Sequence, residues 1–148
     1  MTTYIESKRA RFDYELLETF EAGISLLGSE VKSVRHKLGK LDGAHVVVRG
    51  NEAFLVGASI PAWQPANTTE DYDPERTRTL LLSQKELTKL HTESEKKGLT
   101  LIPIRLYNSG RFLKLELAIA RGKKQFDKRE TLKKRDTDRD LKRELKHQ

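Results

Sequence analysis

The sequence predicts a mainly β fold with two helices and a basic tail at its C-terminal end. Three observations lead to this prediction: β-prone runs separated by turn residues, two short helical stripes, and an uneven distribution of charge. The chain has 148 residues, which is enough for one ordinary domain with its own core and an appendage.

The first β-prone run covers residues 11–27, RFDYELLETFEAGISLL, and is rich in aromatic and other strand-forming residues. Gly23 lies inside this run and predicts a break or bulge. A second region, residues 44–60, contains two β-prone runs around Gly50 and Asn51. This arrangement is typical of a hairpin.

Residues 99–120 give the strongest hairpin pattern of the chain. Four apolar residues alternate with polar ones and predict one buried face: Leu113, Leu115, Leu117 and Ile119. Asn108-Ser109-Gly110 supplies the predicted turn. Pro103 has no amide hydrogen to donate, so we expect it at an edge or a bulge.

Two segments carry helical patterns. The first is residues 28–40, GSEVKSVRHKLGK, with Ser29 as the expected N-cap and Gly39 as the expected stop. Its predicted apolar stripe consists of Val31, Val34 and Leu38, which places Glu30, Lys32, Ser33 and Arg35 on the opposite, outward face.

The second helical segment, residues 83–98, opens with a capping box and ends at Gly98. The box pairs Ser83 with Glu86. Leu87 and Leu90 form its apolar stripe, so we expect the helix to lie on the surface of the β structure.

Between these helices, residues 61–78 hold three of the four prolines and few apolar residues, which predicts a long loop. About six short strands remain. A closed antiparallel barrel removes exposed strand edges, so a small barrel related to the OB-fold is the expected architecture.

The positive charge is concentrated at the C-terminal end. Residues 121–148 contain twelve Lys and Arg against six Asp and Glu, a net charge of +6 of the chain's +7. The expected organisation is a body over 1–122 and a tail over 123–148 that is disordered when free. Such a tail fits a polyanionic partner, and a solubilising appendage is the alternative.

Catalytic and metal-binding patterns are not found in the sequence. It has no cysteine, its four histidines are scattered, and no glycine-rich phosphate loop is present. We therefore expect no catalytic residues, no metal and no cofactor. The start of the chain lacks a signal-peptide pattern and no run reaches bilayer length, so a cytoplasmic protein is expected. We also expect a monomer.

Five ordered blocks resemble a known family. The string EAGISLLGSEVKSVR (21–35) is similar to the signature of the small protein B (SmpB) family. The blocks KRARFDYEL, DPERTRTLLLSQKEL, KGLTLIPIRLY and RGKKQFDKRETLKKR agree with it in order and spacing. Together they extend from about Lys8 to Arg135.

The resemblance implies a role in trans-translation, the rescue of ribosomes stalled on truncated messages. Family members bind the transfer-RNA-like domain of transfer-messenger RNA and bring it to the ribosome. The body takes the place of missing parts of a transfer RNA, while the tail enters the empty message channel and is helical there. The implied partners are transfer-messenger RNA and the ribosome, including its small-subunit RNA.

The resemblance also implies RNA-binding residues in the body. Glu30, Lys32 and Arg35 are expected on the outward face of the first helix, where stabilisation of the helix dipole is the alternative role of Glu30. Leu81 would offer an apolar surface to a base or ribose. Ser83 stands where the family usually has asparagine or histidine, so it serves as a contact or only as the N-cap. Four cations are expected phosphate contacts: Lys8, Arg9, Lys123 and Lys124.

The tail residues implied to act on the ribosome are Phe126, Asp127, Lys128, Arg129, Lys133, Lys134 and Arg135. Asp127, Lys128 and Arg129 match the family's DKR block near the decoding centre. The Phe126 ring would stack on an exposed base or pack back on the barrel.

Two other functions compete with this interpretation. A generic single-stranded RNA-binding barrel needs aromatic side chains along one groove, and the ten aromatics here show no regular platform. An RNA-processing enzyme needs a nucleophile, a base and an orienting group, which the sequence does not assemble.

Overall fold

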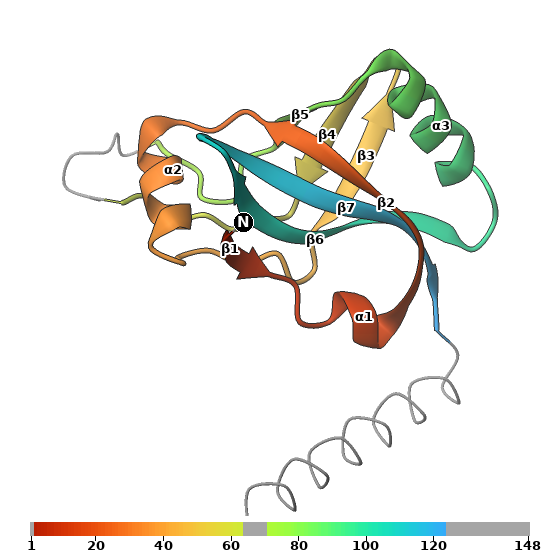
Figure 1. Ribbon diagram of the computed structural model, residues 1–148, viewed down its shortest axis with the longest axis horizontal. Coiled ribbons are helices and arrows are strands. Elements are labelled where there is room, and N and C mark those ends of the chain that lie inside the picture. Colours follow the sequence, from red (N-terminus) through yellow and green to blue (C-terminus); the bar gives the residue numbers. More distant parts are fainter. Residues whose placement is uncertain (1, 64–70, 124–148) are drawn as a thin grey trace, which may run out of the picture.

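The computed structural model describes residues 2–63 and 71–123, which form one curved sheet with three helices (Figure 1). The elements, in chain order, are β1 Thr2–Glu6, α1 Ala10–Asp13, β2 Tyr14–Ile24, α2 Gly28–Arg35, β3 His45–Arg49, β4 Glu52–Val56, β5 Arg78–Leu81, α3 Gln84–Ser94, β6 Leu99–Ser109 and β7 Phe112–Gly122. The mainly β class is confirmed. The four-residue helix α1 was not predicted, because a single turn is too short to show a helical period.

The seven strands pair in the order β1-β6-β7-β2-β5-β4-β3, and every pairing is antiparallel. The sheet curves so that β3 packs against β6. Within the described residues the edge strands β1 and β3 are not hydrogen-bonded to each other. The sheet curves back on itself, but in the described part of the chain its two edge strands form no ladder with each other. The prediction of a closed barrel is therefore wrong in this respect.

Both predicted hairpins are confirmed. β3 and β4 pair in register across the turn at Gly50, whose φ of 60° is favourable for glycine. In the β6–β7 hairpin the ladder extends to the pair Ser109 and Phe112. The turn therefore consists of Gly110 and Arg111 and lies slightly later in the chain than predicted. The register shifts between Pro103 and Arg105, which confirms the expected irregularity at the proline.

The predicted bulge at Gly23 is wrong. The register shift in β2 lies between Leu16 and Glu18, whereas Gly23 pairs regularly with Lys114 on one side and Leu81 on the other. A Cβ added to Gly23 would lie 3.1 Å from the Cβ of Leu81. The glycine therefore permits a close approach of β5 rather than a break in the strand.

The core lies inside the curve of the sheet. The predicted buried face of β7 is confirmed, since its four apolar residues are at most 8% exposed: Leu113, Leu115, Leu117 and Ile119. Leu87 and Leu90 from α3 and Val34 from α2 join the same cluster. This burial of aliphatic side chains is the main source of stability.

The two longer helices begin differently. At α3, the Ser83 Oγ accepts from the Glu86 amide over 3.2 Å, and the Ser83 amide donates to Glu86 Oε1 over 3.1 Å, so the capping box is confirmed. At α2 the N-cap is Leu27, one residue before the helix starts at Gly28, so the prediction for Ser29 is wrong. Glu30 causes this difference, because its carboxylate accepts from the Leu27 amide.

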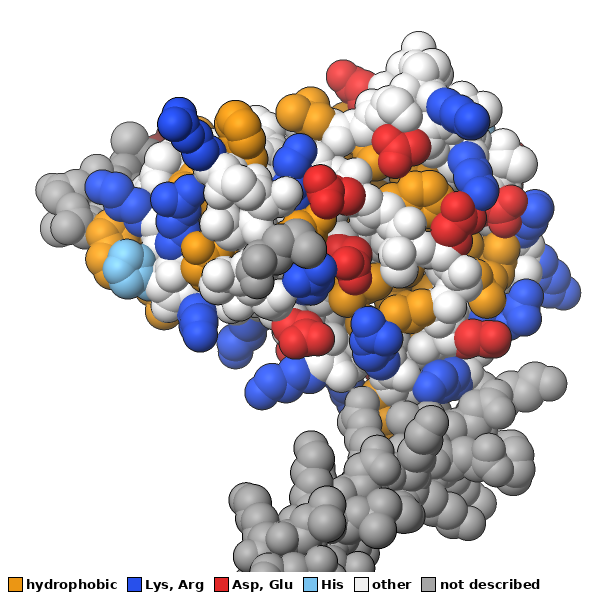
Figure 2. All heavy atoms as spheres, in the orientation of Figure 1, with side chains coloured by type: hydrophobic (Ala, Val, Ile, Leu, Met, Phe, Trp, Pro, Cys, Tyr) orange, Lys and Arg blue, Asp and Glu red, His pale blue; other side chains and the backbone are white. Residues whose placement is uncertain are grey.

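The charged side chains are unevenly placed on the surface (Figure 2). At the end of the molecule that carries α2, the charged side chains on the visible face are mostly lysines and arginines, while both signs mix over the rest of that face. No helix in residues 2–63 or 71–123 is long and apolar enough to cross a bilayer.

Candidate nucleic-acid interface

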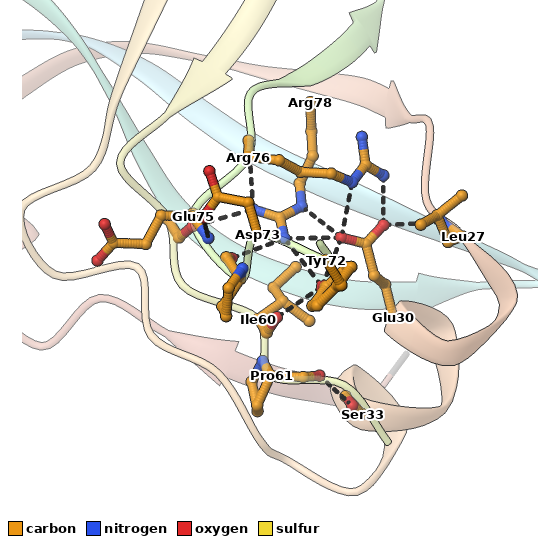
Figure 3. Close-up of polar contacts among 12 residues, drawn as sticks. Leu27, Glu30, Ser33, Ile60, Pro61, Tyr72, Asp73, Glu75, Arg76 and Arg78 are labelled. Atoms are coloured by element: carbon orange, nitrogen blue, oxygen red, sulfur yellow. Dashed lines mark hydrogen bonds and ion pairs between the residues drawn. The ribbon is translucent and has the colours of Figure 1, made fainter. Parts of the chain in front are cut away.

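A buried carboxylate organises the α2 end of the molecule. The Glu30 side chain is 0% exposed and accepts hydrogen bonds from two arginines, a tyrosine and a backbone amide (Figure 3). The expected outward position of Glu30 is therefore wrong. Ser33 is also fully buried, and its hydroxyl donates to the Pro61 carbonyl over 2.6 Å.

Arg76 and Arg78 hold the Glu30 carboxylate from two directions. Arg76 donates through Nε to Oε2 over 3.0 Å and through Nη2 to Oε1, a two-point contact. Arg78 donates through Nε and Nη2 to Oε2 over 3.0 and 2.7 Å. A buried carboxylate with these partners is satisfied, which is what makes its burial tolerable.

Arg78 also fixes the neighbouring backbone. Its guanidinium is 0% exposed and donates to three carbonyls, those of Ala58, Pro74 and Arg76, each over 2.9 Å. The Tyr72 hydroxyl lies 2.9 Å from Glu30 Oε2 and 2.7 Å from the Ile60 carbonyl. The network thus ties α2 to residues 71–78 and to the segment that follows β4.

The pKa of Glu30 is that of an ionised carboxylate. Burial alone raises the pKa of this carboxyl, but hydrogen bonds from Arg76, the Leu27 amide and Arg78 outweigh it and lower the pKa to about 2. Burial and the Glu30 carboxylate raise the pKa of Tyr72. One carboxylate faces two guanidiniums, so the network keeps one net positive charge.

That positive charge reaches the surface through Arg76, whose side chain is 31% exposed. Arg76, Arg78 and Tyr72 were not among the predicted site residues. Arg76 and Arg78 stand two residues apart where the apolar strand β5 begins, and this spacing was the signal in the sequence that could have pointed to them. Their pairing with Glu30 spans 46 and 48 residues, so no local pattern predicts it.

The other predicted body residues fall into two groups. The first group lies near α2 and β5 and is exposed throughout. It consists of Lys32 and Arg35 on α2, Leu81 on β5, which is 63% exposed, and Ser83, which directly precedes α3. Lys8 and Arg9 are exposed just before α1. Lys123 lies beside α1 as well, because its Nζ donates to the Arg11 carbonyl over 2.8 Å.

The predicted tail residues and Lys124 lie outside the described residues. They are Phe126, Asp127, Lys128, Arg129, Lys133, Lys134 and Arg135. In the part of the chain that the structure describes, no group of histidines and carboxylates is placed to hold a metal ion.

The fold and the site together define a class of protein. It is a small antiparallel β protein whose basic end is organised by a buried network of one glutamate and two arginines. A family model described as SmpB protein matches residues 4–147. The chain therefore belongs to the SmpB family, as the sequence resemblance indicated.

Individual relatives agree with this assignment. The SsrA-binding protein of Mesoplasma florum is 46% identical over 141 residues, which cover 95% of each chain. That of Gloeobacter violaceus is 46% identical over 142 residues, 96% of this chain and 93% of the relative. A solved structure described as "tmRNA-SmpB: a journey to the center of the bacterial ribosome" is 44% identical, with a TM-score of 0.67 over 82% of this chain and 85% of that one.

Proposed function

We propose that this chain binds transfer-messenger RNA and acts in trans-translation at stalled ribosomes, as a binding protein rather than a catalyst, in the cytoplasm. The observation that carries the proposal is the similarity over nearly the whole chain to SsrA-binding proteins, together with a solved relative described with tmRNA and the ribosome. The basic surface at α2 supports it, because contacts to phosphates supply a large share of the affinity for nucleic acids.

In this proposal Glu30 is a positioning residue. Its buried carboxylate cannot reach a bound RNA, but it aligns Arg76 and fixes residues 71–78 next to β5. The contacts to RNA come from groups that reach the surface: Lys32 and Arg35 on α2, Arg76, and Leu81 with its apolar side chain. Ser83 caps α3, and a contact from its hydroxyl to RNA stays a prediction.

Lys8, Arg9 and Lys123 form a second basic group beside α1, where β7 ends (Figure 1). Because the chain continues from this point into the basic tail, we infer that this group and Lys124 contact RNA phosphates ahead of the tail.

A competition between two RNAs of equal charge tests the proposal. Transfer-messenger RNA should bind far more tightly than an unstructured oligonucleotide of the same number of phosphates, because folded RNA is recognised by shape as well as by charge. Equal affinity for the two would reduce the chain to a generic single-strand binder and contradict the proposal.

The tail is proposed to act after binding. Truncation after Lys124 should leave affinity for isolated transfer-messenger RNA largely intact and abolish peptide tagging on stalled ribosomes. The full chain under the same conditions is the control. Tagging at the normal rate by the truncated protein would make residues 125–148 a solubilising appendage.

A further inference from the structure

Two aromatic rings stack on each other at the C-terminal end of α2. The ring centroids of His36 and Trp63 are 4.0 Å apart and their planes meet at 21°. His36 directly follows the helix and is exposed, while Trp63 is partly buried. The pair thus presents the histidine ring outward, with the larger ring behind it.

Both sides of the stack are anchored. The His36 Nδ1 lies 2.8 Å from the Lys32 carbonyl, and since a carbonyl only accepts, Nδ1 carries the proton and donates. On the other side, the buried Ser33 hydroxyl donates to the Pro61 carbonyl and holds the chain leading to Trp63 against the helix. A ring fixed in this way loses little freedom when a ligand binds to it.

The helical segment that carries His36 is cationic. Residues 28–40 contain one acidic residue, Glu30, which is buried and paired with two arginines. Their other formal charges are positive and at least partly exposed: Lys32, Arg35, Lys37 and Lys40. Figure 2 shows the same feature, with mostly lysines and arginines among the charged side chains over this end of the visible face.

A planar ring among cations fits one kind of ligand particularly well. An unpaired nucleotide has a flat base that stacks on histidine and tryptophan and a phosphate that attracts lysine and arginine. Acidic peptides would satisfy the cations but need no planar ring, so nucleic acid is the better match.

We propose that the His36–Trp63 pair is a stacking platform for an unpaired base of the bound RNA. This inference rests on the proposed function and deepens it, since it names one contact by which the body holds transfer-messenger RNA. The base would lie on the outer face of the His36 imidazole, with its phosphates within reach of the lysines and arginine around the stack.

Trp63 gives a direct readout because it is the chain's one tryptophan. The full-length protein is titrated with transfer-messenger RNA while the fluorescence of Trp63 is recorded and the affinity measured. We expect the RNA to change the Trp63 emission. His36→Ala should weaken binding at least about five-fold, and His36→Phe should restore most of the affinity, because it keeps a planar ring.

His91→Ala is the matched control, since His91 is an exposed histidine on α3. It should bind like the wild-type chain, and thermal unfolding of each variant verifies that it is folded. An unchanged Trp63 emission, unchanged affinity of His36→Ala, or failure of His36→Phe to restore binding would each overturn the platform while leaving the proposed function intact. If the wild-type chain failed to bind transfer-messenger RNA at all, both would fall.

Discussion

Two networks of arginine, glutamate and tyrosine have similar chemistry but different surroundings. In the first, Glu30 is fully buried between α2 and residues 71–78 and binds Arg76 and Arg78. In the second, Arg105 on β6 pairs with Glu116 on β7 over 3.3 Å, and both side chains are 23% exposed. Arg105 and Glu116 are also cross-strand neighbours in the β6–β7 ladder.

The two networks differ in whether the backbone around them is already held by other hydrogen bonds. Backbone hydrogen bonds hold β6 against β7 whether or not Arg105 meets Glu116, so that ion pair adds only to an existing contact. Residues 71–77 belong to no helix or strand, and their position depends on the side chains of Tyr72, Arg76 and Glu30. The first network therefore builds the surface, while the second reinforces strands that are already paired.

The largest effect should come from Glu30→Gln. This change leaves two guanidiniums facing a neutral amide in a buried site, and we expect a decrease of about 3–5 kcal/mol in the free energy of unfolding. Denaturant titration measures it. Glu116→Gln is the matched control and should cost about 1 kcal/mol or less. Equal decreases for the two would remove the distinction between the networks.

The two arginines of the first network should also differ. Arg78→Met leaves three backbone carbonyls without their donor and should cost about 2–4 kcal/mol, measured by the same titration. Arg76→Met should cost about 1–2 kcal/mol, because Arg76 is partly exposed. It should also weaken RNA binding and make that binding less dependent on salt, because one cation near the phosphates is removed. A larger decrease in stability for Arg76→Met than for Arg78→Met would contradict this order.

Acid titration separates the networks by pH. The folded-state pKa of Glu30 is lowered from 4.5 to about 2, so its contribution to stability is present above pH 4.5 and disappears as the pH falls toward 2. The unfolding free energy should drop by roughly 2–3 kcal/mol through this group over that window. In Glu30→Gln this part of the pH dependence should be missing. If the unfolding free energy of Glu30→Gln fell with acid as steeply as that of the wild-type chain, the assignment of this pH dependence to Glu30 would be refuted.

The smallest effects should come from the tyrosines. Tyr107→Phe removes the hydroxyl that donates to Glu21, and Tyr72→Phe removes the one shared by Glu30 and the Ile60 carbonyl. Each should cost about 1–2 kcal/mol by thermal unfolding, with the larger decrease for Tyr72→Phe. The opposite ranking would mean that the contact from Tyr107 to Glu21 within the sheet stabilises the fold more than the contacts of Tyr72 do.

Local patterns in the sequence predicted the hairpins and α3, and long-range pairings could not be predicted. The β6–β7 hairpin follows from strict alternation near a turn, and the cap of α3 from Ser83 and Glu86. β1 was missed because Thr2–Glu6 is strand only through pairing with β6, about a hundred residues further along the chain. The prediction put Glu30 on the surface because a helical stripe of apolar residues carries no information about distant arginines.

We propose that Glu30 serves RNA binding by positioning residues 71–78, without touching the RNA. Amide hydrogen exchange and RNA affinity, measured together on folded Glu30→Gln, test it most directly. We expect the amides of Ile60 and Arg76, which bond to the Pro74 and Asp73 carbonyls, to become less protected while the affinity falls. Reduced affinity with unchanged protection and an unchanged thermal midpoint would contradict the claim and make Glu30 a direct RNA contact.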